Sequence, residues 1–538
     1  MTFERTGGVP RIIHQTWRSR TVAPEKGDPE SWKRLNPDWE YRFWTDEDLR
    51  AFMAEEFPHL IDLFDGYSLP VQRADLARYC ILYRIGGLYA DIDTRCLATV
   101  EPLAGDERVI LCEEPGEHQH HGRVRGLDTL FFNGTMASPP GHPFWESVLN
   151  HVVLMYPRRD ADVLDTTGPC ILTAAVSQWQ DRDSLALNSS HLFSGLTSLG
   201  GHTGDARWGP YGHLTCSEHL WQGSWIDNVR MPWLKRRRAQ WKRFRHEVLS
   251  RSKRLTLADA RRQIDTGLLT RPLPPEEKHP SIAVLIPVRN GEAFLENGVE
   301  QLLALDYPKD RLHVVYGEGD SEDRTPEVIA EIIARHGETF ASISSVRVER
   351  NGPRLSRSQR WDTRAQLARR SGIAMARNDL LRAAAGLDAD WFLWIDADVI
   401  GLPRDLLQRL LAARAKIVTP DCVLKPGGAS YDLNAFLYIR KPSRAEYYSY
   451  IRHGLFQPPL QYPPRRHLHD LRYLERVPLD SVGGTALLVH GDVHRADLDF
   501  PEIPYRDLVE TEGFGTLARD LGLTPIGLPG VEVVHHAS

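Results

Sequence analysis

The sequence lacks the features that mark secreted, membrane-spanning and zinc-ribbon proteins. Its six cysteines are far apart and form no Cys-x-x-Cys pair, which argues against a zinc site or a dense disulfide framework and fits a reducing compartment. The first ten residues contain neither a basic nor an apolar signal region, and no apolar run approaches the roughly 18 residues of a membrane span. We therefore expect a cytoplasmic protein without a membrane-spanning helix.

An excess of positive charge is also absent. The chain has 66 basic and 72 acidic residues, for a net charge of −6, whereas nucleic-acid-binding domains are usually basic. We therefore expect no nucleic-acid partner. Hydrophobic residues make up 41% of the 538 positions, which excludes a disordered chain and is enough for more than one buried core.

A change of composition divides the chain. Residues 235–254 hold ten Lys or Arg against one acid, and residues 271–280 are rich in proline and charge, which is typical of a linker. We place a domain boundary near 265–280. The predicted parts are a domain at 1–230, a basic helical segment with a Pro-rich linker at 231–280, and a second domain at 281–538.

The basic segment at 233–254 also contains large apolar residues. A basic helix with interleaved aromatics can lie on an anionic bilayer, which predicts a peripheral contact with the inner face of a membrane. The alternative is a connecting helix whose apolar residues pack on a domain. The apolar residues concerned are Trp233, Leu234, Trp241, Phe244, Val248 and Leu249.

Strand and helix patterns alternate in both halves, which predicts an α/β fold with two mostly parallel, Rossmann-like sheets in tandem. The first half has an expected strand at 11–17, a helix at 69–84 and a strand at 88–93, with Gly86-Gly87 between the last two. The second half has expected strands at 282–288, 312–316 and 391–395, and expected helices at 292–305, 325–335 and 364–386.

An Asp-x-Asp pair follows an apolar strand in each half, at Asp91-Ile-Asp93 and Asp396-Ala-Asp398. Ligands of open parallel sheets bind beyond the carboxyl ends of the strands. Two carboxylates there can hold one hard cation, Mn²⁺ or Mg²⁺, which would bridge a nucleoside diphosphate. The alternative is a solvated turn. The apolar strand before each pair favours two metal–diphosphate sites.

Other side chains are candidates for holding a nucleotide. Asp75 and Arg78 share a helix face, where they could bind a sugar hydroxyl and a phosphate or form a surface ion pair. Trp17 could stack on a base or belong to the core. Asp320 could accept from a base or ribose, or cap the helix near Thr325.

Histidines and paired acids complete the candidate sites. His219 and His535 are each a plausible extra Mn²⁺ ligand or a structural histidine. Glu510 and Glu512 stand before a Gly-Phe-Gly sequence, where they could orient an acceptor hydroxyl or take its proton. The alternative for this pair is a polar helix start.

The first half contains an ordered set of motifs, at Pro10–Trp17, Asn36–Tyr41, Trp44–Asp48, Arg73–Tyr79, Gly86–Asp93, Thr167–Pro169 and Gly223–Trp225. By these motifs the chain at about 9–226 resembles glycosyltransferase family 32, the Asp-x-Asp sugar transferases. The resemblance implies a GT-A fold, with Asp75 and Arg78 at the sugar donor and Asp91 and Asp93 at donor and metal. Many family members have histidine where this chain has Glu218, next to His219.

The second half contains its own set of motifs, at Ile373–Asn378, Trp394–Val399, Tyr431–Asn434, Val482–Thr485, Asp492–His494 and Glu510–Gly515. By these motifs the chain at about 281–538 resembles glycosyltransferase family 62, the fungal mannan-polymerase subunits. The resemblance implies a GDP-mannose-dependent α-mannosyltransferase, with Arg377 and Asn378 at the donor. It also implies Asp396, Asp398 and His535 at the metal. Fungal members carry an N-terminal membrane anchor that is not found here, which favours a cytoplasmic enzyme.

These features together predict a bifunctional, metal-dependent glycosyltransferase that adds sugars in succession to a glycan or lipid-linked acceptor. The second domain would use GDP-mannose, and the first a UDP- or GDP-sugar. Retention of the anomeric configuration is expected from the resemblance alone, and no residue is marked as a covalent nucleophile. One alternative is a single active domain with a degenerate carbohydrate-binding partner. Another is a binding scaffold, against which the two intact Asp pairs argue.

Overall fold

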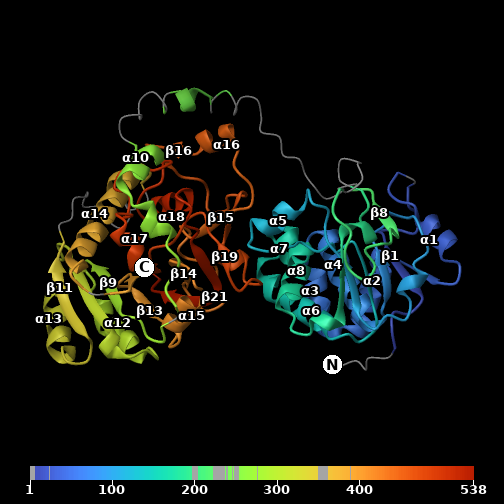
Figure 1. Ribbon diagram of the computed structural model, residues 1–538, viewed down its shortest axis with the longest axis horizontal. Helices are drawn as coiled ribbons and strands as arrows, with labels where there is room; N and C mark the ends of the chain where they lie inside the picture. The colour runs from blue at the N-terminus through green and yellow to red at the C-terminus, as the bar shows by residue number, and fades with distance from the viewer. Residues whose placement is uncertain are drawn as a thin grey trace. The chain divides into compact units, whose positions relative to one another are not determined.

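The computed structural model describes residues 7–23, 25–196, 204–221, 237, 240–244, 246, 254–275, 277–348, 362–387 and 389–537. The chain folds into two compact units, a first unit at Met1–Val229 and a second at Arg230–Ser538 (Figure 1). No helix within the described ranges is both long and apolar enough to cross a membrane. The six cysteines, which all lie in these ranges, form no disulfide.

The first unit is built on a six-stranded sheet with the order β2-β1-β3-β6-β5-β7. Strands β2, β1 and β3 run parallel, β5 and β7 run parallel, and β6 is antiparallel to both of its neighbours. The strands are β1 (Ile12–Thr16), β2 (Glu40–Trp44), β3 (Gly87–Ala90), β5 (Val109–Cys112), β6 (Thr135–Ser138) and β7 (Leu185–Asn188).

Helix α4 carries two of the candidate residues of this unit. It begins at Pro70, whose missing N–H costs nothing in a first turn, and it ends before Gly86 and Gly87, which have φ of 74° and 93°. Only glycine adopts this backbone readily, so the chain turns there directly into β3. The helices are α1 (Pro29–Leu35), α2 (Asp46–Glu56), α3 (Ile61–Gly66), α4 (Pro70–Arg84), α5 (Gln119–Arg123), α6 (Phe144–Met155), α7 (Val163–Thr166) and α8 (Pro169–Gln178).

The second unit is built on a larger sheet with the order β11-β10-β9-β12-β20-β14-β21-β13, in which β19 also pairs with β21. Strands β11, β10, β9 and β12 are parallel, and β20 is antiparallel to β12 and β14. The strands are β9 (Ile282–Val288), β10 (Leu312–Glu318), β11 (Ser342–Arg347), β12 (Trp391–Ile395), β13 (Val399–Gly401), β14 (Ile417–Val423), β19 (Val477–Pro478), β20 (Ala486–His490) and β21 (Ile526–His535).

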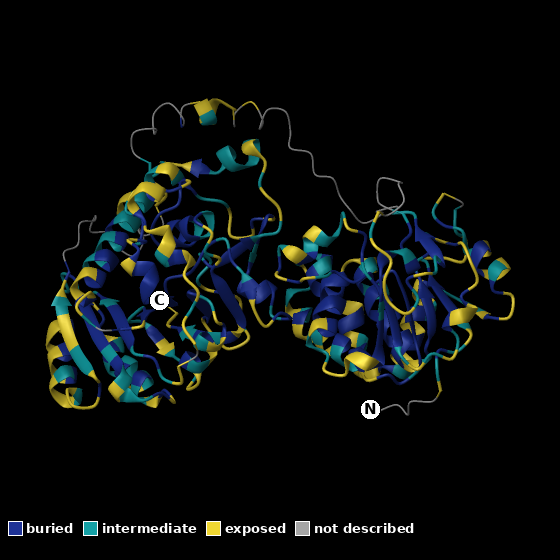
Figure 2. Ribbon diagram, viewed as in Figure 1, coloured by how far each residue is buried: buried dark blue, intermediate teal, exposed yellow. Residues whose placement is uncertain are grey.

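Helices cover this sheet and leave its central strands buried (Figure 2). Part of the predicted linker also packs here, because the Asp265 amide donates to Ala496 O at 3.0 Å and Lys416 Nζ donates to Leu268 O at 2.6 Å. The helices are α10 (Leu257–Gln263), α11 (Thr266–Thr270), α12 (Glu292–Ala304), α13 (Thr325–His336), α14 (Gln366–Ala384), α15 (Leu406–Ala412), α16 (Arg444–Ser449), α17 (Gly491–Arg495) and α18 (Glu510–Asp520).

The α/β class predicted from the sequence is confirmed in both units, and each sheet combines a parallel run with reversed strands. In each unit the reversed strand lies beside the strand that leads into the Asp pair, as β6 beside β3 and β20 beside β12. The strands that lead into the Asp pairs, β3 and β12, end at Ala90 and Ile395. The first aspartate of each pair is therefore the residue directly after its strand. Strand β3 is shorter than the predicted 88–93 because its last residues form this turn.

Candidate metal and donor sites

A short two-stranded ladder assembles the candidate metal site of the first unit. Strands β4 (Thr94–Cys96) and β8 (Ser217–His219) pair antiparallel with Thr94 opposite His219, which places His219 Nε2 3.2 Å from Asp93 Oδ1. Ligand atoms of Asp91, Asp93 and His219 all lie within 4.8 Å of one another. Two carboxylates and an imidazole are a suitable donor set for Mn²⁺ or Mg²⁺.

Arg78 on α4 holds the first of these carboxylates. Its Nη2 lies 3.0 Å from Oδ1 of both Asp75 and Asp91, and its Nη1 donates to Asn133 O at 2.7 Å. The guanidinium lies over the Tyr89 ring at 4.7 Å. Arg78 therefore fixes the position of Asp91 and neutralises part of its charge.

Asp75 lies behind Arg78 and is only 3% exposed. Its oxygens accept from Thr167 Oγ1 at 2.8 Å and from Asn133 Nδ2 at 3.2 Å. Burial raises the pKa of Asp75 to about 6, although the Arg78 charge and the Thr167 hydroxyl act in the opposite direction. With its oxygens used in this way, Asp75 orients Arg78 in this structure and offers little surface to a sugar.

Tyr89, which the sequence arguments missed, connects the Asp pair to β1. Its hydroxyl donates to Asp91 Oδ1 at 2.9 Å and lies 3.0 Å from Thr16 Oγ1. Trp17 follows Thr16 directly and is half-buried, and its amide continues the ladder to Trp44 O at 3.0 Å. The loop that carries Trp17 therefore starts beside Asp91. A tyrosine two residues before an Asp-x-Asp pair was the available signal for this link.

The second unit repeats the contact between the second aspartate and a histidine. Val399 of β13 is opposite His535 of β21, and His535 Nε2 lies 3.0 Å from Asp398 Oδ1. Burial opposes a charge on His535, but the hydrogen bond and the charge of Asp398 outweigh it and raise the pKa of His535. Among the described residues, however, only the three ligands of the first unit gather within 4.8 Å.

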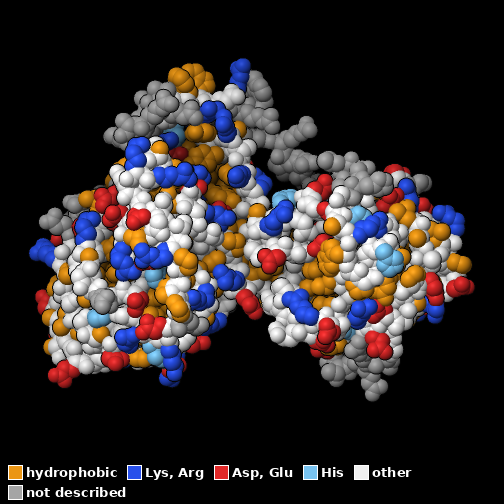
Figure 3. Space-filling view, viewed as in Figure 1, with side chains coloured by type: hydrophobic (Ala, Val, Ile, Leu, Met, Phe, Trp, Pro, Cys, Tyr) orange, Lys and Arg blue, Asp and Glu red, His pale blue; other side chains and the backbone are white. Residues whose placement is uncertain are grey.

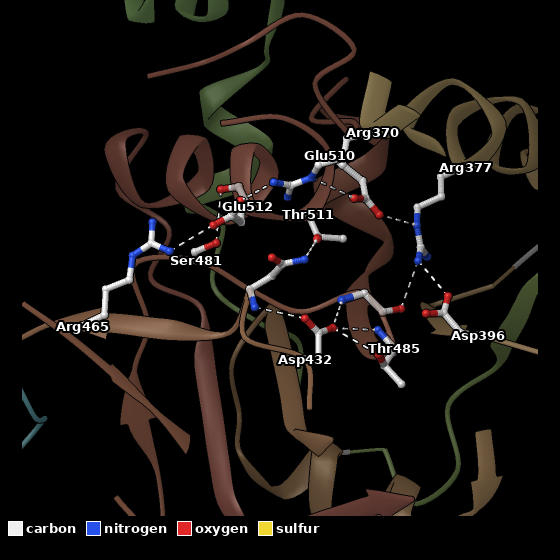
Figure 4. Close-up of polar contacts among 12 residues, drawn as sticks. Arg370, Arg377, Asp396, Asp432, Arg465, Ser481, Thr485, Glu510, Thr511 and Glu512 are labelled. Atoms are coloured by element: carbon white, nitrogen blue, oxygen red, sulfur yellow. Dashed lines mark hydrogen bonds and ion pairs between the residues drawn. The ribbon is translucent and has the colours of Figure 1, made fainter. Parts of the chain in front are cut away.

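Arg377 on α14 holds the first aspartate of this unit (Figure 4). Its Nη2 lies 2.8 Å from Asp396 Oδ1 and donates to Gly484 O at 3.2 Å, and its Nε lies 3.4 Å from Glu510 Oε1. The guanidinium lies over the Trp394 ring at 5.5 Å. Its Nη1 is buried and has no hydrogen-bond partner among the described residues. Asp396 is thus held as Asp91 is, and one buried donor remains available to an anion.

Glu510 and Glu512 are brought to the same region with different surroundings (Figure 4). Glu510 opens α18 with a φ of 55° and faces Arg377. Glu512 accepts from Arg370 Nη1 at 2.7 Å and from Arg465 Nη1 at 3.2 Å. Burial disfavours its charge, but the two arginines outweigh burial and lower the pKa of Glu512. Glu512 is therefore held as a buried carboxylate, a poor proton acceptor.

Asp432 orders the loops around this arginine. It accepts from the amides of Gly484 at 2.8 Å, Thr485 at 3.2 Å and Asn434 at 3.1 Å. The Gly484 carbonyl in turn accepts from Arg377. The sequence motifs contained Asp432, but nothing in their spacing marked it as a residue that would organise the site.

Two predicted donor residues of the second unit, Asn378 and Asp320, contact residues other than the Asp pair. Asn378 donates to Phe500 O and Glu502 Oε1, both at 3.0 Å, and accepts from the Phe500 amide. Both ends of its amide therefore hold the loop at 500–502. Asp320 has a φ of 53°, and its carboxylate lies 3.5 Å from Arg347. Asp323, not Asp320, accepts from the Thr325 amide at the start of α13.

Comparison with known families agrees with the two resemblances seen in the sequence. Residues 24–110 match the family described as "Glycosyltransferase sugar-binding region containing DXD motif", and residues 262–504 match the family Anp1. The chain therefore carries two regions related to glycosyltransferases, one in each unit.

Individual relatives are mannosyltransferases or mannan polymerase subunits by name. Inositol phosphoceramide mannosyltransferase 3 of Schizosaccharomyces pombe is 34% identical over 33% of this chain and 47% of its own length. Mannan polymerase complex subunit mnn9 of the same yeast is 28% identical over 51% of this chain and 85% of its own. The chain spans about half the length, or less, of several curated relatives that it matches.

Among solved structures, a mannosyltransferase from Pyrobaculum calidifontis in complex with GDP-Man and Mn²⁺ is 18% identical. The match covers 57% of this chain and 68% of the chain in that structure, with a TM-score of 0.30.

Proposed function

We propose that the chain is a bifunctional glycosyltransferase with one metal–diphosphate donor site in each unit. One observation carries the proposal. In both units a helix arginine holds the first aspartate of an Asp-x-Asp pair, and a histidine from a later strand contacts the second. A solvated turn does not need partners that fix its carboxylates. A cation site that binds a diphosphate does, because its ligands must keep one orientation.

The residues divide the work in a simple way. In each unit the Asp pair and the histidine would hold the cation, which would neutralise the charge that develops on a diphosphate leaving group. The arginine keeps the first carboxylate in one orientation. In the second unit, Arg377 also has the buried Nη1 donor without a partner, which suits a phosphate oxygen.

The finer assignments rest on the relatives. We infer that the second unit is an α-mannosyltransferase that uses GDP-mannose, as its match to the mannan polymerase family suggests. The first unit would act on a glycan or lipid-linked acceptor, in keeping with its inositol phosphoceramide mannosyltransferase relatives. Both carboxylates are buried and paired with two arginines: Glu510 with Arg370 and Arg377, and Glu512 with Arg370 and Arg465. Their contacts single out neither as the group that takes a proton from an acceptor hydroxyl. Retention of the anomeric configuration, which follows from the family resemblance alone, is part of this proposal.

The test is a donor panel with the full chain. Release of free sugar and transfer to simple glycoside acceptors are measured with UDP- and GDP-sugars and Mn²⁺ or Mg²⁺. We expect turnover that stops after exhaustive EDTA treatment and returns with the metal. Unchanged turnover without metal would contradict both sites.

A second candidate is supported by the compactness of the first site. Only Asp91, Asp93 and His219 bring three ligand atoms within 4.8 Å among the described residues, so the first unit could be the active one and the second a carbohydrate-binding partner. The same panel separates the two. A product with one added sugar under all conditions favours a single active unit, and a product with two different additions favours the bifunctional enzyme.

A further inference from the structure

A short helical stretch of the basic segment is fixed to the second unit by one face. Residues 237, 240–244 and 246 have helical backbone and include the short green helix above α16 in Figure 1. His246 is buried, with its Nε2 2.9 Å from Asp507 Oδ1, and Lys242 Nζ donates to Ser449 O at 3.1 Å. The buried His246 marks the side of the stretch that packs on the unit. Lys242, one turn earlier, stays exposed although its ammonium reaches the Ser449 carbonyl.

The aromatic residues of the stretch are on another face. Trp241 is 71% exposed and Phe244 is 62% exposed, and their rings contact each other with centroids 6.4 Å apart. Residues three apart share a face. The aromatic residues of an ordinary connecting helix would pack on a domain, but this pair does not. The other large apolar residues of the segment, Trp233, Leu234, Val248 and Leu249, lie outside the described residues.

Positive charge accompanies this aromatic pair. Arg452 of β16 (Ile451–Arg452) donates from Nη1 to Ser449 O at 2.8 Å, the same carbonyl that accepts from Lys242. Two exposed cations thus converge on one oxygen. Burial and the neighbouring charge of Arg452 both lower the pKa of Lys242. An anion between the two side chains would remove this repulsion.

A further exposed apolar residue belongs to the same part of the unit. Leu460 is 77% exposed and stands two residues before Tyr462, whose ring packs on Tyr450 at 5.3 Å. Tyr450 follows Ser449 at the end of α16. Hydrophobic and basic side chains are visible together on this upper edge of the second unit (Figure 3).

We propose that Trp241 and Phe244, flanked by Lys242 and Arg452, form a membrane-binding patch that docks the second unit on an anionic bilayer. The aromatic pair would enter the interfacial region, and the two cations would contact phosphate-bearing headgroups. Asp507, which anchors His246, stands three residues before Glu510. Docking would therefore bring a lipid surface to the part of the unit where α18 begins. The binding itself does not rest on transferase activity.

Co-sedimentation of the full chain with vesicles tests the proposal. Vesicles of phosphatidylcholine alone are compared with vesicles that also contain phosphatidylglycerol, at low and at physiological ionic strength. We expect binding to the anionic vesicles only. Trp241→Ala/Phe244→Ala should lower the partition coefficient at least about tenfold, because two large apolar side chains lose their burial. Lys242→Gln should lower it about fivefold, the effect of one basic residue near an anionic surface.

Matched variants separate the patch from general effects. Trp208→Ala removes another exposed tryptophan, which is 40% exposed, and Arg404→Gln removes another exposed cation, with a side chain that is 73% exposed. Both should leave vesicle binding unchanged. Because all these side chains are exposed, melting temperatures should also stay close to that of the wild type.

Three results of the vesicle assay would overturn the proposal. These are no binding of the wild type to anionic vesicles, equal binding of the wild type and the Trp241/Phe244 double variant, and equal binding to neutral and anionic vesicles. Wild-type protein that sediments without vesicles, while the double variant stays soluble, would instead assign the aromatic pair to contact between copies of the chain. That result would also overturn it.

Discussion

Both units place an arginine, a histidine and an aromatic ring around their Asp pair, but different carboxylates neutralise the charge of the arginine. Arg78 and Arg377 each hold a first aspartate and each lie over an aromatic ring two residues before it, Tyr89 or Trp394. In the first unit the other partner is Asp75, one turn away on the same helix. In the second it is Glu510, which comes from α18 far along the chain.

This difference shows that one electrostatic requirement can be met locally or at long range. A buried guanidinium needs carboxylate partners, because burial without them costs several kcal/mol. The first unit supplies the second carboxylate within α4, so the arginine is ordered by its own helix. The second unit depends on the packing of α18 against α14, and it extends the network to Arg370, Glu512 and Arg465.

Removing the two arginines should have the largest effect on stability. Arg78→Met should lower the free energy of unfolding by about 3–5 kcal/mol, because Asp75 and Asp91 lose their buried partner. Adding Asp75→Asn should recover much of the loss at pH 8, where Asp75, with a pKa of about 6, is charged. In the second unit, Arg377→Met should cause a similar loss, and adding Glu510→Gln should recover much of it. Denaturant unfolding of the full chain measures both.

A surface pair provides the control for this comparison. Arg404 and Asp306 lie 2.8 Å apart with side chains that are 73% and 52% exposed, so Arg404→Met should cost less than about 1 kcal/mol. A greater loss for Asp75→Asn combined with Arg78→Met than for Arg78→Met alone would show that Asp75 stabilises the fold independently of Arg78.

The second comparison concerns the two reactions. Asp93→Asn should abolish the first transfer and leave the second unit active on a supplied acceptor, and Asp398→Asn should do the converse. Each substitution keeps the size of the side chain and removes charge from the cation site. We expect a loss of roughly 10²-fold or more in the corresponding step. Mass spectrometry of the products identifies which sugar is missing.

The outcome decides between two active sites and one. If both variants lose the same single sugar, there is one reaction, and the other Asp pair serves the fold or binding. The order in which the first unit acts before the second is taken from their order in the chain, and the product of Asp398→Asn tests it.

The sequence predicted those parts of the fold and site that depend on neighbouring residues. The apolar run Ile282–Val288 is β9 with the same bounds, and Trp391–Ile395 is β12, because buried parallel strands read as unbroken apolar runs. The position of each Asp pair at a strand end followed from the same runs. The i, i+3 spacing placed Asp75 and Arg78 on one helix face. The ion pair that they form there is the alternative to donor binding, but it is buried and not at the surface.

Contacts between distant segments could not be read in this way. The partners of Glu512 come from α14 and from β18 (Arg465–His467), and no periodicity relates these segments to α18. Asn378 was expected at the donor because of its motif, but its amide is complementary to the loop at 500–502. Such pairings depend on tertiary packing, which a single sequence does not specify.

Acid pH should distinguish the central strands of the two units. His14 on β1 is fully buried, with Nε2 donating to Gly86 O at 2.9 Å and Nδ1 accepting from Trp44 Nε1 at 3.1 Å. Burial lowers its pKa to about 3 from 6.5. The equivalent strand β9 contains no titratable residue.

The sign of this effect follows from linkage. Between pH 6.5 and about 3, His14 is protonated in the unfolded chain but stays neutral in the folded one. The free energy of unfolding therefore falls as the pH falls, by up to about 1.4 kcal/mol per pH unit. His14→Gln has no charge to gain and should show a shallower decline. Calorimetric melting temperatures measured from pH 6.5 downward check this. Parallel declines for the two proteins would remove His14 as a cause.

The smallest effect is expected at Glu218, next to His219. Neighbouring residues on a strand point to opposite faces, so the register that places His219 opposite Thr94 turns Glu218 toward Arg95, at 3.0 Å. Glu218 therefore cannot join Asp91 and Asp93. Because Arg95 is 48% exposed, Glu218→Gln should cost no more than about 1 kcal/mol and leave the metal dependence of the first transfer unchanged.

His219→Gln, one residue away, should raise the Mn²⁺ concentration needed for half-maximal transfer. Equal effects of the two variants would mean that the β4–β8 register does not select the ligand, and the likeness between His219 and His535 would then no longer hold.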